Sequence, residues 1–221
     1  MKVVLAQKLL RANQQVAREN RERFGRVLAV NLVSSPGAGK TAILERTIAA
    51  LKGEFGIGVI EGDIYTTRDA ERIAGHGVDV VQVNTTGACH LDASMVARAL
   101  DEIDLRGLDI LFIENVGNLV CPAEFDLGED CKVAVLSVAE GGDKPVKYPL
   151  VFQEARVVLV NKSDLLPYTD FDLPAVEREI LAINPEIEIF TVSARTGAGL
   201  EAWYAWLRSA VARKQSASAT G

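Results

Sequence analysis

The stretch Val33-Ser34-Ser35-Pro36-Gly37-Ala38-Gly39-Lys40-Thr41 decides the fold class of this chain. It follows a short, β-branched apolar run and precedes a segment whose apolar residues have helical spacing. Apart from Ser34, which stands in place of the first glycine, it matches the pattern G-x-x-x-x-G-K-S/T, in which a glycine-rich turn curls its backbone N–H groups around an anion. The N-terminus of the following helix adds partial positive charge. The sequence therefore predicts a strand, a phosphate-binding loop and a helix in succession.

The residues of this loop have separate expected roles. Lys40 would reach the β- and γ-phosphates of a nucleotide, and Thr41 would ligate Mg²⁺. A glycine-rich turn without a ligand is the alternative, and the Lys-Thr pair directly after the turn argues against it. The residues expected to contact the nucleotide here are Gly37, Ala38, Gly39, Lys40, Thr41 and Ala42.

Apolar runs and helical segments alternate along the rest of the chain. The runs are short, β-branched and mostly continuous, which is typical of strands buried on both faces of a parallel sheet. They are Val27–Val33, Ile57–Ile60, Val78–Val83, Asp109–Ile113, Val133–Val138, Val157–Val160 and Ile187–Val192. The helical segments are Lys40–Lys52, Thr67–Gly75, Asp92–Ile103, Ala175–Ile183 and Leu200–Lys214. This order predicts an α/β fold, a three-layer P-loop NTPase with a mostly parallel seven-stranded sheet and helices on both faces.

The chain is expected to have three parts. Residues 1–25 would form an amphipathic helix, because Leu5, Leu9, Ala12 and Val16 have helical spacing among charged residues. This helix either packs on the edge of the domain or docks a partner protein. Residues 26–214 would form the nucleotide-binding domain. Residues 215–221, which are rich in Ser, Ala and Thr, are expected to be a disordered tail.

Composition excludes several classes of protein. The 24 Lys and Arg residues against 30 Asp and Glu give a net charge of −6, so no basic field favours a nucleic-acid partner. No apolar run has the length of a membrane span, and the first residues lack the apolar block of a secretory signal. Three cysteines do not make a disulfide framework. We therefore expect a cytoplasmic protein without a nucleic-acid or membrane partner.

A second motif predicts which nucleotide is bound. Asn161-Lys162-Ser163-Asp164 follows a buried apolar run and has the N-K-x-D pattern of guanine-reading loops. The Asp164 carboxylate can accept hydrogen bonds from guanine N1–H and the exocyclic amino group, whereas adenine presents a lone pair at N1. Asn161 would tie this loop to the phosphate loop, and the Lys162 stem would cover one face of the base. Ser193-Ala194, after the last predicted strand, would contribute a backbone N–H to guanine O6, so GTP is favoured over ATP.

Acidic residues at strand ends are the candidates for hydrolysis. Glu114-Asn115-Val116-Gly117 resembles a D-x-x-G element with Glu in place of Asp. Glu114 would hold the Mg²⁺ shell, and Gly117 would offer its N–H to the γ-phosphate and move when that phosphate leaves. Asp63, at the end of another strand, is a second candidate for binding Mg²⁺ or positioning water. Together with Lys40 these two acids are the predicted catalytic residues, and slow turnover is expected because no glutamine aligns the attacking water.

A cysteine and histidine pair forms a candidate metal site. Cys89-His90 precedes a predicted helix, whose N-terminus favours a thiolate, and Cys121 follows Gly117 by four residues. Imidazole and thiolate together suit Zn²⁺ or Ni²⁺. Three ligands do not close a tetrahedral site, so a second copy of the chain, backbone groups or water would complete it. Buried cysteine without a metal is the alternative, and it is the interpretation we adopt for Cys131.

The motifs together resemble the hydrogenase nickel-incorporation GTPases, the HypB family, over about residues 27–214. The resemblance is carried by the phosphate loop, the Asn161-Lys162-Ser163-Asp164 loop, and in particular by two blocks, Cys89-His90-Leu91 and Glu114-Asn115-Val116-Gly117-Asn118-Leu119-Val120-Cys121-Pro122. The serine at position 34 is then a family trait.

The resemblance implies a GTP-hydrolysing metallochaperone that binds nickel and assists its insertion during the maturation of nickel–iron hydrogenase. It implies GTP-dependent homodimerisation and a Ni²⁺ or Zn²⁺ site of Cys89, His90 and Cys121 at the dimer interface. A HypA-like nickel metallochaperone would contact the N-terminal segment, and the hydrogenase large subunit would be reached indirectly. Two other interpretations stay open: a GTPase assembly or signalling switch without a functional metal site, and a small-molecule kinase.

Overall fold

The computed structural model describes the backbone of residues 2–63 and 67–219, and side chains for residues 9–63 and 67–218. Seven strands form one sheet in the order β3-β2-β4-β1-β5-β6-β7, and every pair of neighbours is parallel. The strands are β1 Leu28–Ser34, β2 Ile57–Asp63, β3 Asp79–Asn84, β4 Ile110–Glu114, β5 Cys131–Ser137, β6 Ala155–Asn161 and β7 Glu188–Thr191. This confirms the predicted α/β fold, with a sheet that is parallel throughout.

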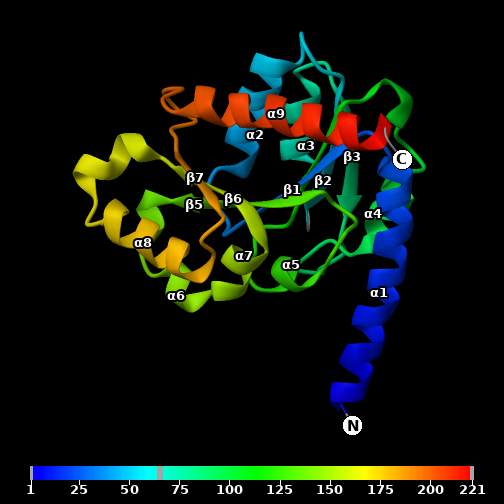
Figure 1. Cartoon of the computed structure of the whole chain (residues 1–221), viewed down its shortest axis with the longest axis horizontal. Helices are drawn as coiled ribbons and strands as arrows, with labels where there is room; N and C mark the ends of the chain where they lie inside the picture. Colours follow the sequence, from blue (N-terminus) through cyan, green and yellow to red (C-terminus); the bar gives the residue numbers. More distant parts are fainter. Residues whose placement is uncertain (1, 64–66, 220–221) are drawn as a thin grey trace.

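Helices cover both faces of this sheet (Figure 1). Helices α2, α3 and α9 lie on one face, and α1, α4, α5, α7 and α8 lie on the other. The helix bounds are α1 Lys2–Phe24, α2 Lys40–Leu51, α3 Arg68–Ala74, α4 Ala93–Ala99, α5 Cys121–Glu124, α6 Lys144–Lys147, α7 Pro149–Glu154, α8 Leu173–Ile183 and α9 Leu200–Ala219. Short 3-10 turns occupy Leu105–Gly107, Val138–Glu140 and Ser163–Tyr168.

The central strands are buried on both sides because successive side chains point to opposite faces. In β1, Val30 and Leu32 pack with α2 and α9, whereas Ala29 and Val33 pack with the helices of the opposite face. All seven residues of β1 are buried. This double burial explains why the strands read as continuous apolar runs rather than alternating ones.

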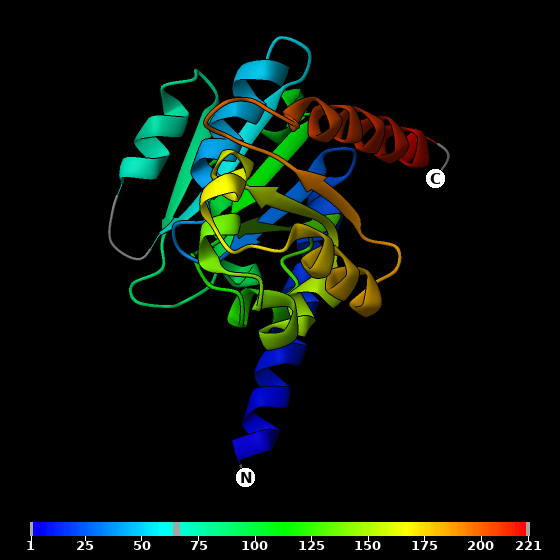
Figure 2. The ribbon, with the colours of Figure 1, turned by 90° about the vertical axis from the view of Figure 1, so that its left-hand side faces the viewer.

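The N-terminal helix packs on the domain by a face other than its apolar stripe. Its N-terminal half projects away from the rest of the molecule, and its C-terminal half lies along α4 (Figures 1 and 2). Of the predicted apolar stripe, Leu9 is 66% exposed, Ala12 is exposed and Val16 is half-buried, while the Leu5 side chain lies outside the described residues.

Two buried asparagines define the face that does pack. Asn20 Nδ2 donates to Ala93 O at 2.8 Å and to Leu127 O at 3.0 Å. Asn13 Nδ2 donates to the Asp126 carbonyl at 2.7 Å, and its Oδ1 accepts from Ala93 N at 2.8 Å. The spacing of apolar residues does not reveal contacts of this kind, in which asparagine side chains form hydrogen bonds with loop carbonyls. The predicted helix is present, and it packs on the domain through these asparagines rather than through its apolar stripe.

Two element ends also differ from the predictions. The helix expected over Asp92–Ile103 ends at Ala99 and is followed by a 3-10 turn. The tail expected to be disordered from residue 215 instead continues α9 through Ala219. Gln215 Nε2 donates to Asp109 Oδ1 at 2.8 Å, which anchors this last part of the helix to the start of β4. No helix in residues 2–63 and 67–219 is long and apolar enough to span a membrane.

Replacing Asn20 with alanine should destabilise the protein by about 2 kcal/mol, because two buried carbonyls lose their donor. The melting temperature should fall by about 4–8 °C. Thermal unfolding followed by circular dichroism measures this, with the exposed Gln14→Ala as the control on the same helix. Equal melting temperatures for the two variants would contradict the role assigned to the asparagine contacts.

Candidate functional site

The phosphate loop connects β1 to α2 in a conformation that only glycine adopts readily. Gly37 and Gly39 have φ values of +79° and +100°. A Cβ atom at Gly39 would lie 2.4 Å from Asn161 Nδ2, so this position tolerates no side chain. The glycine spacing in the sequence thus correctly indicated a tight turn.

Lys40 is held inside the loop by the residue that departs from the glycine pattern. Its Nζ donates to Ser34 Oγ at 2.9 Å, and Ser34 Oγ donates to the Ser35 carbonyl at 2.6 Å. Burial lowers the pKa of Lys40, and the nearby Glu114 carboxylate opposes that shift. Ser34 therefore supplies an acceptor for the ammonium group where a glycine would supply none.

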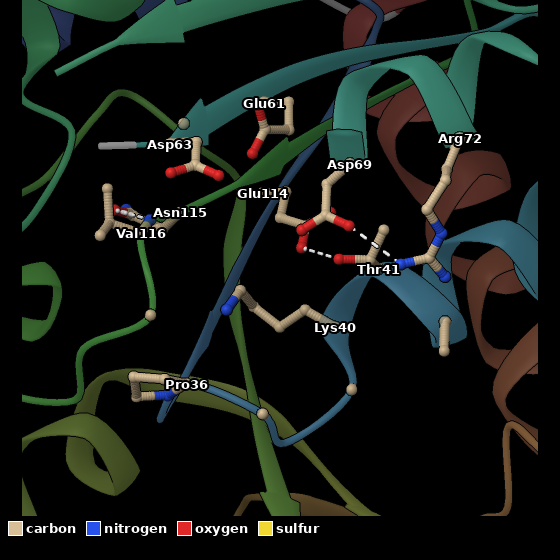
Figure 3. Close-up of a pocket in the computed structure, with 15 residues that line it drawn as sticks. Pro36, Lys40, Thr41, Glu61, Asp63, Asp69, Arg72, Glu114, Asn115 and Val116 are labelled. Atoms are coloured by element: carbon tan, nitrogen blue, oxygen red, sulfur yellow. Dashed lines mark hydrogen bonds and ion pairs between the residues drawn. The ribbon is translucent and has the colours of Figure 1, made fainter. Parts of the chain in front are cut away.

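A cavity of about 440 Å³ opens in front of the loop (Figure 3). Most predicted phosphate and Mg²⁺ residues line it, whereas Ala38 is buried outside its lining and touches the loop of Asn161. Three charged residues outside the predicted set of site residues, Glu61, Asp69 and Arg72, also line it. The predicted residues that do so are Gly37, Gly39, Lys40, Thr41, Ala42, Asp63, Glu114 and Gly117.

Two glutamates lie side by side on the wall of this cavity. Glu61 of β2 and Glu114 of β4 occupy paired register positions and are 3% and 4% exposed. Thr41 Oγ1 donates to Glu114 Oε1 at 2.7 Å, and among the described residues Oε2 of each glutamate is buried without a hydrogen-bond partner. Burial, followed by the Glu114 charge, raises the pKa of Glu61 to about 8, and burial also raises the pKa of Glu114.

These unpartnered oxygens fit a divalent cation. Mg²⁺ prefers carboxylate, hydroxyl and phosphate oxygens, and Thr41, Glu114, Glu61 and Asp63 present such oxygens around one cavity. The sequence did contain a signal for Glu61, because it lies two residues before Asp63 on the same strand face.

The predicted base-reading residues lie together on the other side of the phosphate loop. Asn161 Nδ2 donates to Ala38 O at 2.9 Å, and Lys162 Nζ donates to Gly37 O at 2.7 Å. Ala194 N donates to Asn161 Oδ1 at 3.0 Å, which joins the loop after β7 to the same group. Ser193 Oγ donates to Asp164 Oδ1 at 2.6 Å and so fixes the orientation of that carboxylate. These residues do not line the 440 Å³ cavity.

The loop after β4 reaches from this cavity to the candidate metal ligands. A Cβ atom at Gly117 would lie 3.0 Å from Pro36 Cα, so this glycine touches the phosphate loop. Four residues later the chain arrives at Cys121, the first residue of the short helix α5. The same loop therefore contacts the nucleotide cradle at one end and carries a thiol at the other.

Cys89, His90 and Cys121 converge on one point. The two sulfurs are 3.2 Å apart, Cys89 Sγ lies 3.7 Å from His90 Nδ1, and one ligand atom from each residue falls within 4.8 Å of the others. Asn118 Nδ2 donates to the Cys89 carbonyl at 3.2 Å and links the two loops. The prediction that these three residues form a cluster is supported by this geometry.

The surroundings of the cluster shift the pKa values of Cys121 and His90. The hydrogen bond with Cys89, together with burial, raises the pKa of Cys121. Burial lowers the pKa of His90, which favours the neutral imidazole that ligates metals. Metal binding would therefore release thiol protons and weaken at low pH. Cys131, at the start of β5, packs against the core, and burial raises the pKa of its thiol to about 12.

Comparison with known proteins assigns the chain to a family. The family model described as the CobW/HypB/UreG nucleotide-binding domain matches residues 28–191. The hydrogenase maturation factor HypB of Rhizobium leguminosarum bv. viciae is 52% identical over 208 residues, which cover 93% of this chain and 70% of the relative. The chain belongs to the HypB family. Its resemblance to that family, drawn from the motifs, is thereby confirmed.

Two solved HypB structures share this fold. HypB from Archaeoglobus fulgidus superposes with a TM-score of 0.85 at 37% identity, covering 91% of this chain and 100% of that one. HypB from Helicobacter pylori, in complex with nickel, gives a TM-score of 0.87 at 38% identity, covering 92% and 97%. The P-loop nucleotide-binding architecture is therefore that of the HypB family.

Replacing Glu61 with glutamine should flatten the pH dependence of stability in the absence of nucleotide and Mg²⁺. The folded-state pKa of Glu61 is raised from 4.5 to about 8, so the folded protein keeps a proton that the unfolded chain has lost. Linkage requires the wild-type free energy of unfolding to fall as pH rises through this window. At pH 8, E61Q should be more stable by on the order of 1 kcal/mol, or about 2–4 °C in melting temperature.

Near pH 5 the wild type and E61Q should have similar melting temperatures, because the wild-type carboxyl is then also neutral. Thermal unfolding in EDTA at both pH values tests this, with the exposed Glu102→Gln as a matched control. A wild-type pH slope that persists in E61Q would assign the dependence to another group.

Proposed function

We propose that this HypB-family chain is a GTP-hydrolysing metallochaperone that binds nickel and assists its insertion during the maturation of nickel–iron hydrogenase. The observation that carries the proposal is the convergence of Cys89, His90 and Cys121, because Cys121 lies at the far end of the loop that lines the nucleotide cavity. The nickel complex of the Helicobacter pylori HypB supports nickel as the cargo.

The residues around the cavity have defined tasks in hydrolysis. Lys40 exchanges the Ser34 hydroxyl for the β- and γ-phosphate oxygens and offsets their charge. Thr41, Glu114 and Asp63 would hold Mg²⁺ directly or through water, and its charge would offset the repulsion between the buried carboxylates of Glu61 and Glu114. Gly117, against Pro36, offers its N–H toward the γ-phosphate. The reaction is hydrolysis of GTP to GDP and phosphate.

Guanine selectivity comes from the residues behind the phosphate loop. Asp164 faces the base with one carboxylate oxygen already bonded to Ser193, so its orientation is fixed before the nucleotide arrives. Asn161 bonds both Ala38 O and Ala194 N, which ties the base-reading loops to the phosphate loop. Lys162, with its stem beside Gly37, covers the base.

A second copy of the chain would complete the metal site. The three ligands lie at the surface, and Cys89 is exposed. Val120, which precedes Cys121, is 50% exposed. An exposed apolar side chain beside an incomplete ligand set favours a homodimer that forms with GTP.

The projecting half of α1, which carries the exposed Leu9, is the candidate surface for a HypA-like nickel metallochaperone. The hydrogenase large subunit would receive nickel indirectly.

Replacing Cys121 with serine should weaken nickel binding by about 100-fold, because one of three ligands is lost. Isothermal titration with Ni²⁺, in GDP and in a non-hydrolysable GTP analogue, measures the affinity. Cys131→Ser is the matched control, because this thiol packs against the core and lies outside the cluster. Size-exclusion chromatography of the same samples should show a dimer with the GTP analogue and a monomer with GDP.

Nickel affinity indifferent to Cys121→Ser would remove the metallochaperone proposal. If GTP binding and dimerisation persisted in that case, the chain would be a GTPase assembly or signalling switch without a functional metal site.

Replacing Asp164 with asparagine should lower GTP affinity by roughly 30- to 1000-fold, because guanine N1–H and its amino group lose a charged acceptor. Xanthosine triphosphate should bind the variant better than GTP does, since the asparagine amide can donate to the C2 carbonyl of xanthine. Competition with a fluorescent nucleotide measures both affinities. Unchanged GTP affinity would instead favour a kinase that does not read guanine through this loop.

A further inference from the structure

Consecutive residues at the end of β4 face opposite sides of the sheet. Glu114 points to the face of α2, where it accepts the Thr41 hydroxyl bond at 2.7 Å. Asn115 is the next residue and is 1% exposed. Its backbone N–H donates to the Leu32 carbonyl at 3.1 Å and so continues the hydrogen bonds between β4 and β1. Because side chains alternate along an extended backbone, the Asn115 amide group points to the side that carries α1 and α4.

The Asn115 side chain bonds both loops that carry the candidate metal ligands. Its Oδ1 accepts from Leu91 N at 3.0 Å and from Val116 N at 3.0 Å. Leu91 directly follows Cys89 and His90, whereas Val116 begins the segment that leads to Cys121. One carbonyl oxygen thus sets the distance between the two loops at the point where both approach the cluster.

Asn115 is itself held by a chain of buried polar groups, which we call the amide chain: Asn115, Asn31, Glu129 and Lys132. Asn115 Nδ2 donates to Asn31 Oδ1 at 3.3 Å, and Asn31 Nδ2 donates to Glu129 Oε1 at 3.0 Å. Lys132 Nζ pairs with the same Glu129 oxygen at 3.2 Å, and Leu127 N donates to Glu129 Oε2 at 2.6 Å. The four side chains are buried, with Asn31 wholly so, in the middle of β1.

This arrangement is rigid for a physical reason. Each member of the amide chain has partners inside the protein, so a rotation of Asn115 would leave Asn31 Oδ1 and the Leu91 N–H without their bonds to Asn115, away from water. Asn31 is itself neither a lining residue of the cavity nor a member of the metal cluster, and it contacts the cavity lining through Asn115. Its only evident effect on either site runs through Asn115.

We infer that Asn115, held by Asn31, is a positioning residue for the metal ligands. When the nucleotide displaces the Glu114–Gly117 segment, Asn115 transmits that displacement to the loop of Cys89 and His90. The inference rests on the proposed function, because it assigns a route between the nucleotide cavity and that metal cluster. A movement of Gly117 toward a γ-phosphate shifts Val116 and Asn115 with it, and the Oδ1 bond carries that shift to Leu91. Because coupling between two binding sites is reciprocal, metal binding changes nucleotide affinity by the same factor as nucleotide binding changes metal affinity.

The test replaces Asn31 with alanine in the full chain. N31A removes the acceptor of Asn115 Nδ2 and leaves every cavity and cluster residue in place. Nickel affinity should fall by about tenfold, and the ratio of nickel affinities in the GTP analogue and in GDP should move toward one. GTP and GDP affinities measured without nickel should stay within about twofold of wild type.

Asn184→Ala is the matched control. Asn184 Nδ2 donates to the carbonyls of Phe152 and Ala155, both at 3.1 Å, so this variant also loses internal amide bonds, but outside the amide chain. It should lower the melting temperature without changing nickel affinity. An equal loss of nickel affinity in N31A and N184A would reduce the effect to general destabilisation and overturn the inference.

The failures of the two proposals are distinguishable. A nickel affinity that depends on Cys121 but is unchanged in N31A overturns the inference alone. A nickel affinity that is the same in wild type and Cys121→Ser removes the metal site, and the inference with it.

Hydrogen exchange of the wild-type protein gives a second measurement that needs no variant to fold. The Leu91 amide should exchange at rates that differ by about fivefold or more between the GDP and GTP-analogue states, because its acceptor moves with the nucleotide loop. Equal Leu91 exchange in the two states, alongside a change at Gly117, would overturn the inference.

Discussion

The parallel pairing of β1 with β4 is the constraint on which the rest of the site depends. Register places Leu32 opposite Glu114, so the strand that enters the phosphate loop lies beside the strand that supplies the acidic group. Because every strand runs in the same direction, all of the loops that follow strands open at one edge of the sheet. The nucleotide cavity, the base-reading loops and the cysteine-bearing loops are neighbours for that reason. A reversed strand would have sent one of them to the opposite edge.

The cavity wall holds two buried carboxyl groups that the surrounding protein stabilises only in part. Glu61 and Glu114 meet at paired positions, each with one carboxyl oxygen that no described residue satisfies, and burial disfavours their ionisation. A buried carboxylate is costly unless a cation or hydrogen bonds compensate. The fold therefore carries a local instability at its functional edge, and a ligand that brings a divalent cation relieves it. Such local costs are typical of sites that bind rather than of cores.

Much of this architecture could be predicted from the sequence, since the signals for it are local. Continuous apolar runs indicated doubly buried strands, and the phosphate loop is a contiguous motif. The packing face of α1 and the role of Asn31 could not be predicted in the same way. An asparagine in an apolar strand or helix looks like an interruption, and only the tertiary structure shows that its amide meets Asn115 or the Ala93 carbonyl. Glu61 was missed although its spacing from Asp63 was informative.

The contact between Gly39 and Asn161 has a consequence for how such a protein can change over generations. A Cβ at Gly39 would displace the Asn161 amide, which also bonds Ala38 and Ala194. Any larger residue at position 39 would disturb phosphate and base recognition in a single step. Because this contact links the phosphate loop to the base-reading loop, a change at position 39 affects both. A homologue with a different nucleotide preference would therefore be expected to keep Gly39 and Asn161 and to differ at the periphery of the base pocket.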